Sequence, residues 1–258
     1  MKVLAICNLK GGVAKTTTVV NLAADLARLH GKRVLVIDAD SQCNATEFFG
    51  GGREGHSLAT LLRIKKDERT VFSLQFEADQ AISASNFPGV DLLPADDSLM
   101  DLDLSKAETG VAWAECLATL KPALTRYDFV LIDCPPAFNA AAAAALLAAD
   151  EVVIPIKPDA FALRGLTNLL RQINNMQKIN PTLRIAGVLP VMVYGSKAEE
   201  DAIKVLRLYG LTALPRIRRS TMVDTMTYCQ EPLIVSSPRS GACIDYKALA
   251  AKIAEGRY

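Results

Sequence analysis

The sequence predicts an α/β fold in which a mostly parallel, twisted sheet forms the middle of three layers and helices cover both of its faces. Short apolar runs alternate along the chain with longer segments of helical pattern. Runs that are apolar on both faces are typical of parallel strands buried under crossover helices. The first run is followed by a glycine-rich turn and then by a helical pattern, the order in which a strand, a phosphate-binding loop and a helix follow one another.

Six apolar runs are expected to form the strands, because they lack the polar alternation of half-exposed strands. They lie near residues 2–7, 33–37, 89–94, 129–133, 152–156 and 185–193. Segments with helical spacing lie between them, near residues 16–30, 111–125, 140–148, 163–178 and 197–209. Alanine has the highest helix propensity, so the alanine-rich stretch at 140–145 favours a helix. Residues 50–86 show no readable periodicity, and we expect a loop and a solvated turn there.

Length and composition favour one domain that spans residues 1–258. A chain of 258 residues, half of them hydrophobic, approaches the size at which a single core stops growing. Its net charge of +1 predicts by itself neither a nucleic-acid nor a membrane partner. The six cysteines form no Cys-x-x-Cys pair, which argues against a zinc site and suggests a reducing compartment. The chain begins directly with a strand and has no apolar run of ~20 residues, so we expect a cytoplasmic protein without signal peptide or membrane span.

The turn after the first strand has the composition of a phosphate-binding loop. It reads Lys10-Gly11-Gly12-Val13-Ala14-Lys15-Thr16-Thr17. The glycines let successive backbone N–H groups converge on phosphate oxygens, while the following helix N-terminus and Lys15 supply positive charge. Thr16 is expected to place its hydroxyl on Mg²⁺. Lys10 is not part of an ordinary phosphate loop and stands at the mouth of this one.

Three aspartates follow or end predicted strands. Asp133 ends the run at 129–133, where its carboxylate can reach a Mg²⁺ ion at the loop through water. Asp38 and Asp40 follow the run at 33–37 and share a face if the chain is extended. Phosphoryl transfer requires metal ligands and a positioned water, which such carboxylates can supply. The alternative interpretation is that all three only cap strands or turns.

These motifs resemble those of the deviant Walker A ATPases of the ParA/MinD family, whose loop reads Lys-Gly-Gly-x-Gly-Lys-Thr-Thr. Residues 34–46 resemble the family's second motif, and residues 127–136 resemble its Walker B strand and the switch that follows. Further matching segments occur in the family's order, at 161–166, 214–216 and 237–242. The resemblance covers nearly the whole chain and is strongest to the short, Soj-like ParA partition ATPases.

The resemblance implies an ATP- and Mg²⁺-dependent switch for plasmid or chromosome partition, in which ATP is sandwiched in a homodimer. In the family, the lysine at the position of Lys10 crosses the two-fold interface and touches the partner's nucleotide, as an arginine finger does. Hydrolysis is slow and is stimulated by a ParB-like partner protein. The resemblance assigns Lys10, Lys15 and Asp40 to catalysis, Asp40 orienting the attacking water. It assigns Thr16, Asp40 and Asp133 to Mg²⁺, and Asp38 to a supporting role beside the nucleotide.

Two residues depart from the family's pattern. Ala14 replaces the usual glycine before Lys15, and alanine costs about 1 kcal/mol if the position requires a positive φ. Ser41 replaces the usual proline after Asp40, so the switch is expected to be less rigid.

The nucleotide-base and DNA contacts are predicted from weaker patterns. Pro215 and Arg216 match a family segment near the base, although a Pro-Arg pair is also a common turn. No acidic residue occurs from 204 to 219, and short ParA proteins bind DNA nonspecifically through C-terminal basic patches. This makes the chain a candidate nucleoid-associated protein, unless the run is only a solvated face. The candidate DNA-binding residues are Lys204, Arg207, Arg218 and Arg219, with Arg216 in the same run.

Two other function classes remain open at this point. A membrane-cycling ATPase of the MinD kind needs a C-terminal amphipathic helix with bulky apolar and basic faces. Residues 246–254 carry small side chains instead, and we expect their apolar face to dock on the domain. An enzyme like the nitrogenase iron protein needs two cysteines per chain for an iron–sulfur cluster, and the cysteines of this chain show no clear match.

Overall fold

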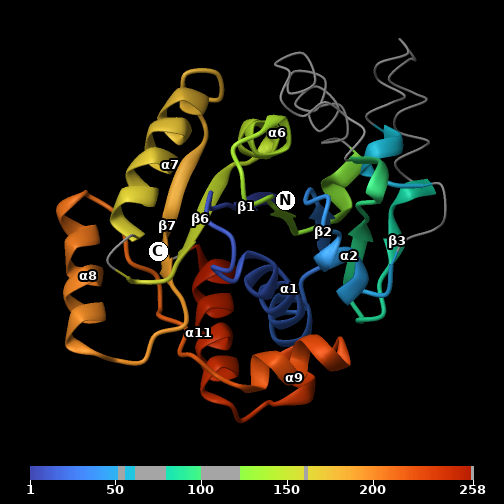
Figure 1. The fold of residues 1–258 in the computed structure, drawn as a ribbon. Helices are drawn as coiled ribbons and strands as arrows, with labels where there is room; N and C mark the ends of the chain where they lie inside the picture. The colour runs from blue at the N-terminus through green and yellow to red at the C-terminus, as the bar shows by residue number, and fades with distance from the viewer. Residues whose placement is uncertain (52–55, 62–79, 100–122, 160–161, 257–258) are drawn as a thin grey trace.

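The computed structural model describes residues 1–51, 56–61, 80–99, 123–159 and 162–256 (Figure 1). Most of the helix expected at 111–125 lies outside these residues, as does Phe161 of the matching segment at 161–166. All statements below concern the described part of the chain.

Seven strands form one sheet in the order β3-β4-β2-β5-β1-β6-β7 (Figure 1). Every neighbouring pair is parallel except β3 and β4. The strands are β1 (Lys2–Ile6), β2 (Val34–Asp38), β3 (Ser83–Ala84), β4 (Val90–Leu93), β5 (Phe129–Asp133), β6 (Glu151–Ile156) and β7 (Arg184–Pro190). The six predicted strands are confirmed. The edge strand β3 was not predicted, because two small residues give no readable pattern.

Both faces of the sheet are covered, which explains why its strands read as continuous apolar runs. In β1, Val3 and Ala5 belong to one hydrophobic cluster, and Leu4 and Ile6 belong to another. The first cluster includes residues of α6 (Ala140–Ala148) and α7 (Ala162–Gln177); the second includes residues of α1 (Lys15–His30) and α11 (Gly241–Glu255). Alternate side chains of one strand therefore bury against opposite layers, and the predicted three-layer α/β fold is confirmed.

The remaining helices are short or lie near the end of the chain. They are α2 (Asn44–Phe48), α8 (Lys197–Leu208), α9 (Met222–Cys229) and α10 (Leu233–Ser236), with 3₁₀ turns at Asp97–Leu99 and Ala123–Arg126. The sequence did not predict α2, α9 or α10, which are too short to show a helical period. None of the described helices combines the length and the apolar character that a membrane crossing requires.

Helix α11 packs along α1, so the apolar face at 246–254 docks on the domain as expected, although its partner helix was not predicted. Tyr246, Leu249 and Ile253 are buried in this contact. The Tyr246 hydroxyl lies 3.3 Å from Thr18 Oγ1 of α1, and the amide side chain of Asn21 accepts a hydrogen bond from Leu233 N (2.9 Å) of α10. The helix that begins at the phosphate loop is thus tied to two C-terminal helices by buried polar contacts.

The sheet brings the predicted motifs to one edge. In the register of the parallel strands, Asp133 of β5 lies opposite Ile6 of β1 on one side and opposite Asp38 of β2 on the other. The carboxyl ends of parallel strands form the usual ligand-binding edge of an open α/β sheet. The candidate site is therefore assembled from segments that are far apart in the sequence.

Candidate active site

The loop between β1 and α1 has the turns that a phosphate cradle requires. Gly12 has φ 69° and Ala14 has φ 58° and ψ 35°. Glycine adopts this left-handed conformation freely, whereas the Cβ of alanine is crowded there at a cost of about 1 kcal/mol. Ala14 is also the N-cap residue of α1 and has no side-chain cap. The position that the family fills with glycine therefore does require a positive φ, and this chain carries the cost.

Lys15 lies over the loop rather than in solvent. It is the first residue of α1, only 7% exposed, and its Nζ donates a hydrogen bond to the Lys10 carbonyl oxygen at 3.3 Å. The side chain thus folds back across the turn that it follows. An anion cradled by the loop amides would meet this fixed positive charge and the partial positive charge of the α1 N-terminus.

The mouth of the loop is anchored to the end of β6 and to the segment that follows it. The buried Asn8 side chain donates to the Pro155 carbonyl (2.6 Å) and accepts from Lys10 N (3.0 Å). The Lys10 ammonium lies 2.9 Å from Asp159 Oδ2. Sequence reasoning missed Asn8 and Asp159; a polar residue directly after the apolar run at 2–7 was the only signal for Asn8.

Asp133 and Thr16 form the centre of the carboxylate cluster. Thr16 Oγ1 donates to Asp133 Oδ2 at 2.6 Å. Asp133 Oδ1 is buried and has no hydrogen-bond partner in the described part of the chain. Burial, and then the charge of Asp38, raise the pKa of the Asp133 carboxyl well above its usual value. A cation at this point would relieve both the unmet acceptor and the crowded negative charge.

Asp38 organises the turn that carries Asp40. Its side chain accepts hydrogen bonds from Thr46 N and Thr46 Oγ1, both at 2.8 Å, and from Asp40 N at 3.1 Å. Burial raises the pKa of Asp38 to about 6. Both of its oxygens are thus used within the protein, whereas Asp40 is 7% exposed and its side chain accepts a hydrogen bond from Gln42 N (3.1 Å). Asp38 is thus bound to the turn through both oxygens and is fully buried, while Asp40 lies slightly nearer to solvent.

The residues at this edge fit Mg²⁺ that arrives with a nucleotide. Mg²⁺ prefers oxygen ligands and is usually held by one or two carboxylates together with phosphates and water. Asp133 Oδ1 and the Thr16 hydroxyl supply such oxygens beside the loop. No group of three or more His, Cys, Asp or Glu side chains suited to a metal occurs in the described ranges.

A cavity of about 140 Å³ adjoins the loop on the side of β7. Ala14 and Thr17 form part of its wall. The rest comes from Val191, Met192, Ile217, Arg218, Arg219, Ser220, Thr221, Val223, Asp224 and Tyr246. Its lining includes Ile217 but neither Pro215 nor Arg216, the predicted base contacts. Pro215 is half-buried and Arg216 is exposed. The sequence analysis assigned Ala14 and Thr17 to the nucleotide and Arg218 and Arg219 to DNA, but it did not predict that they share a cavity.

The predicted basic residues are at the surface, but several of them already contact acidic or aromatic side chains of the same chain. Lys204 pairs with Asp201 at 2.9 Å. The Arg218 guanidinium binds both carboxylate oxygens of Asp245 at 2.8 Å and also the Gly241 carbonyl. Arg219 stacks over the exposed Tyr194 ring, with 5.4 Å between Cζ and the ring centroid. Arg207 belongs to α8, but its side chain lies outside what the structure describes.

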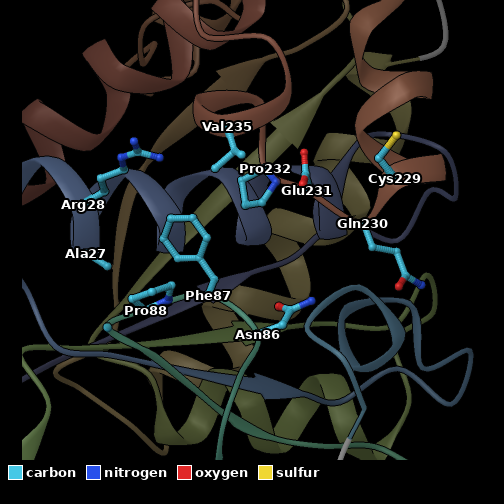
Figure 2. A pocket seen from close by; sticks show the side chains of 11 residues that line it. Ala27, Arg28, Asn86, Phe87, Pro88, Cys229, Gln230, Glu231, Pro232 and Val235 are labelled. Atoms are coloured by element: carbon cyan, nitrogen blue, oxygen red, sulfur yellow. The ribbon is translucent and has the colours of Figure 1, made fainter.

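A larger cavity, of about 790 Å³, lies away from this site (Figure 2). Ala27 and Arg28 of α1, the turn at 86–89 and residues 229–232 line it, together with Val235; the Phe87 ring lies in the middle of the view. Ala27 is 12 residues beyond Lys15 (27 − 15) along α1, which corresponds to about 18 Å of helix rise. Although this cavity is larger, it lies too far from Lys15 to belong to the candidate active site.

The phosphate loop between β1 and α1, with carboxylates at the ends of β2 and β5, is the architecture of a P-loop nucleotide-binding protein. Residues 1–185 match the family described as AAA domain. The chain is 40% identical over 199 residues to the chromosome partitioning protein ParA of Caulobacter vibrioides, a match that covers 74% of this chain and 70% of ParA. It is 35% identical over 262 residues to the sporulation initiation inhibitor protein Soj of Bacillus subtilis, covering 98% of each.

Solved structures agree with these matches. The ATP complex of a variant of McdA from Cyanothece superposes with a TM-score of 0.82 at 28% identity, covering 100% of this chain and 97% of McdA. Cobyrinic acid a,c-diamide synthase from Mycobacterium smegmatis, with bound ATP analog and magnesium, gives a TM-score of 0.77 at 30% identity and covers 98% and 94%. The chain belongs to the ParA/MinD family of P-loop ATPases.

Proposed function

We propose that this chain, as one ATPase domain over residues 1–258, is an ATP-driven switch in plasmid or chromosome partition. Its ATP-bound homodimer holds nonspecific double-stranded DNA on the nucleoid, and hydrolysis, stimulated by a ParB-like partner, releases it. The observation that carries the proposal is the additional lysine at the mouth of the loop, Lys10. Lys10 stands at the mouth with 47% of its side chain exposed, outside the cradle that Lys15 covers. The name of the relative ParA, a chromosome partitioning protein, supports the same role.

Each residue of the site has a distinct part in the proposed reaction. The loop amides and Lys15 bind the outer phosphates, and the base enters the cavity beside Ala14 and Thr17. When bound, Mg²⁺ neutralises charge on the transferred phosphoryl group; Thr16, Asp40 and Asp133 would hold it directly or through water. Asp40 accepts a hydrogen bond from the attacking water and so orients it.

Lys10 supplies the partner's site with a cation. A positive charge in trans stabilises the charge that develops on the phosphoryl oxygens during transfer. Because the same contact belongs to the interface, ATP binding favours the dimer by mass action. Hydrolysis removes the phosphoryl group that Lys10 contacts across the interface, and the dimer is then no longer stabilised by this contact.

The proposed DNA surface includes Lys204, Arg207, Arg218 and Arg219. Dimerisation doubles the number of phosphate contacts, so affinity should depend steeply on ATP and on salt. Contacts to phosphates position a protein without reading bases, and we therefore expect no sequence preference.

A mobility-shift experiment with the Asp40→Ala variant tests this function. The variant should bind ATP with near-native affinity, hydrolyse it at least about a hundredfold more slowly and accumulate as a dimer. With ATP it should retard two unrelated DNA fragments equally, and without ATP neither. Equal retardation without nucleotide would contradict the switch, and preference for one fragment would contradict nonspecific binding. If DNA is not bound at low salt, flotation with liposomes and ATP tests a MinD-like membrane role instead.

A further inference from the structure

Two separate contacts fix Lys10 to the end of β6 and to the segment that follows it. Asn8 holds its backbone, because the Asn8 amide bridges Lys10 N and the Pro155 carbonyl near the end of β6. Asp159 holds its side chain through the 2.9 Å ion pair. Asn8 is 5% exposed and makes both hydrogen bonds, at 2.6 Å and 3.0 Å, so it ties the backbone of the loop mouth to β6. The side-chain contact is more open, with 47% of the Lys10 side chain and 30% of the Asp159 side chain exposed.

The two contacts differ in what dimer formation would require of them. The backbone anchor can persist while the Lys10 side chain swings outward. The ion pair cannot, because an ammonium that reaches a nucleotide on another subunit must leave its own carboxylate. An exposed ion pair is weak enough to break in this way, whereas a buried one would hold the lysine permanently.

We propose that Asp159 is a positioning residue that keeps Lys10 within its own subunit and so opposes premature dimerisation. The inference rests on the proposed function, in which Lys10 acts across the dimer interface. Nucleotide on the partner competes with Asp159 for the same ammonium, and it prevails because triphosphate carries more negative charge than one carboxylate. The ion pair thereby sets the threshold at which ATP-bound subunits associate.

The expected size of the effect follows from the exposure of the pair. An exposed ion pair is equivalent to a factor of about 1.4 to 5 in an equilibrium constant. Two such pairs break when a symmetric dimer forms. Removing both should therefore tighten the dimer by about twofold to thirtyfold. Because salt screens exposed charges, the gain should shrink between about 50 mM and 500 mM salt.

The test compares dimer dissociation constants by analytical ultracentrifugation, with Mg²⁺ and a non-hydrolysable ATP analogue. Asp159→Asn should dimerise more tightly than the unsubstituted protein, while the affinity of its dilute monomer for the analogue stays the same. Asp201→Asn is the matched control, since it removes another exposed pair, to Lys204 at 2.9 Å, away from the loop; it should change nothing. In a Lys10→Gln background, Asp159→Asn should also have no effect, because the two residues act through one contact.

The outcomes separate this inference from the proposed function. Unchanged or weaker dimerisation of Asp159→Asn would overturn the inference, as would equal tightening in the Lys10→Gln background. Tighter binding of the analogue by the monomer would also overturn it, because the carboxylate would then act on the nucleotide of its own subunit. If the unsubstituted protein forms no analogue-dependent dimer, the proposed function fails first, and the inference falls with it.

Discussion

The phosphate-loop edge and the basic stretch at 204–219 both gather cations, but the fold surrounds those cations differently. At the loop, Lys15 is 7% exposed and is held by a backbone carbonyl. In the basic stretch, Lys204 and Arg218 are exposed and pair with Asp201 and Asp245. The first arrangement leaves a buried ammonium near carboxylates that can share a metal. The second neutralises much of its own charge at the surface.

The difference shows what a local pattern can and cannot predict. A phosphate loop is a contiguous segment whose turns, glycines and helix start set its shape, so its geometry follows from its own residues. The surroundings of a run of basic residues are not set by the run itself. Its electrostatic potential depends on which acidic side chains the fold places beside it. The absence of acidic residues from 204 to 219 therefore overstated the free charge of this surface.

Lys15→Ala should have the largest effect in either region. The loop loses the buried cation that faces the outer phosphates, so we expect ATP affinity to fall at least about a hundredfold, as for loss of a desolvated charge contact. Isothermal titration measures the change, with Lys10→Ala as the matched control, whose monomer should bind ATP nearly normally. Near-native affinity for Lys15→Ala would refute the P-loop assignment.

The carboxylates that surround the loop were predicted only in part. Asp38, Asp40 and Asp133 could be found because each ends or follows an apolar strand, and the parallel sheet then places β5 between β1 and β2, with Asp133 opposite Asp38. The partners of Lys10 and Arg218 could not be predicted. Asp159 is 149 residues away from Lys10, and Asp245 is 27 residues away from Arg218. Long-range pairs of this kind leave no periodic signal.

The second prediction concerns a buried carboxylate further along α1. Asp25 is 2% exposed, and burial raises its pKa from 3.8 to about 7. The folded state thus keeps the Asp25 proton to a higher pH than the unfolded state, and stability falls as pH rises from about 4 to 7. Asp25→Asn should remove this penalty and stabilise the protein by on the order of 2 kcal/mol at pH 8, with little gain at pH 4. Thermal unfolding at both pH values tests it; a gain that does not depend on pH would contradict it.

The third prediction separates two adjacent arginines of the basic stretch. Because Arg218 is bound by Asp245 and Arg219 is not, Arg219→Gln should weaken DNA binding by the ATP dimer about tenfold at low salt. Arg218→Gln should weaken it less and should lower the melting temperature instead. Asp245→Asn, which loosens the hold on Arg218, serves as the control and should bind DNA slightly more tightly. The reverse ranking of the two arginines would show that the ion pair opens on DNA.

The smallest expected effect concerns the loop residue that departs from the family's pattern. Ala14→Gly relieves the strain at φ 58° but adds freedom to the unfolded chain, so the net gain should be below about 1 kcal/mol. Ala14→Val should instead destabilise by more than about 1 kcal/mol, because a β-branched side chain fits this conformation poorly. Urea denaturation of both variants gives the comparison. Equal stability of the two would mean that the loop relaxes to another conformation.

The strand order has a consequence for how the protein is made. β1 pairs with β5 and β6 but not with β2, its successor in the sequence. A ribosome that has released the first 60 residues has therefore delivered the whole phosphate-loop motif, but none of the strands that flank β1. Since contacts of high sequence separation form late, the nascent chain cannot hold its nucleotide loop in shape until residues 129–133 have emerged. Nucleotide binding should thus begin only after roughly half of the protein has been synthesised.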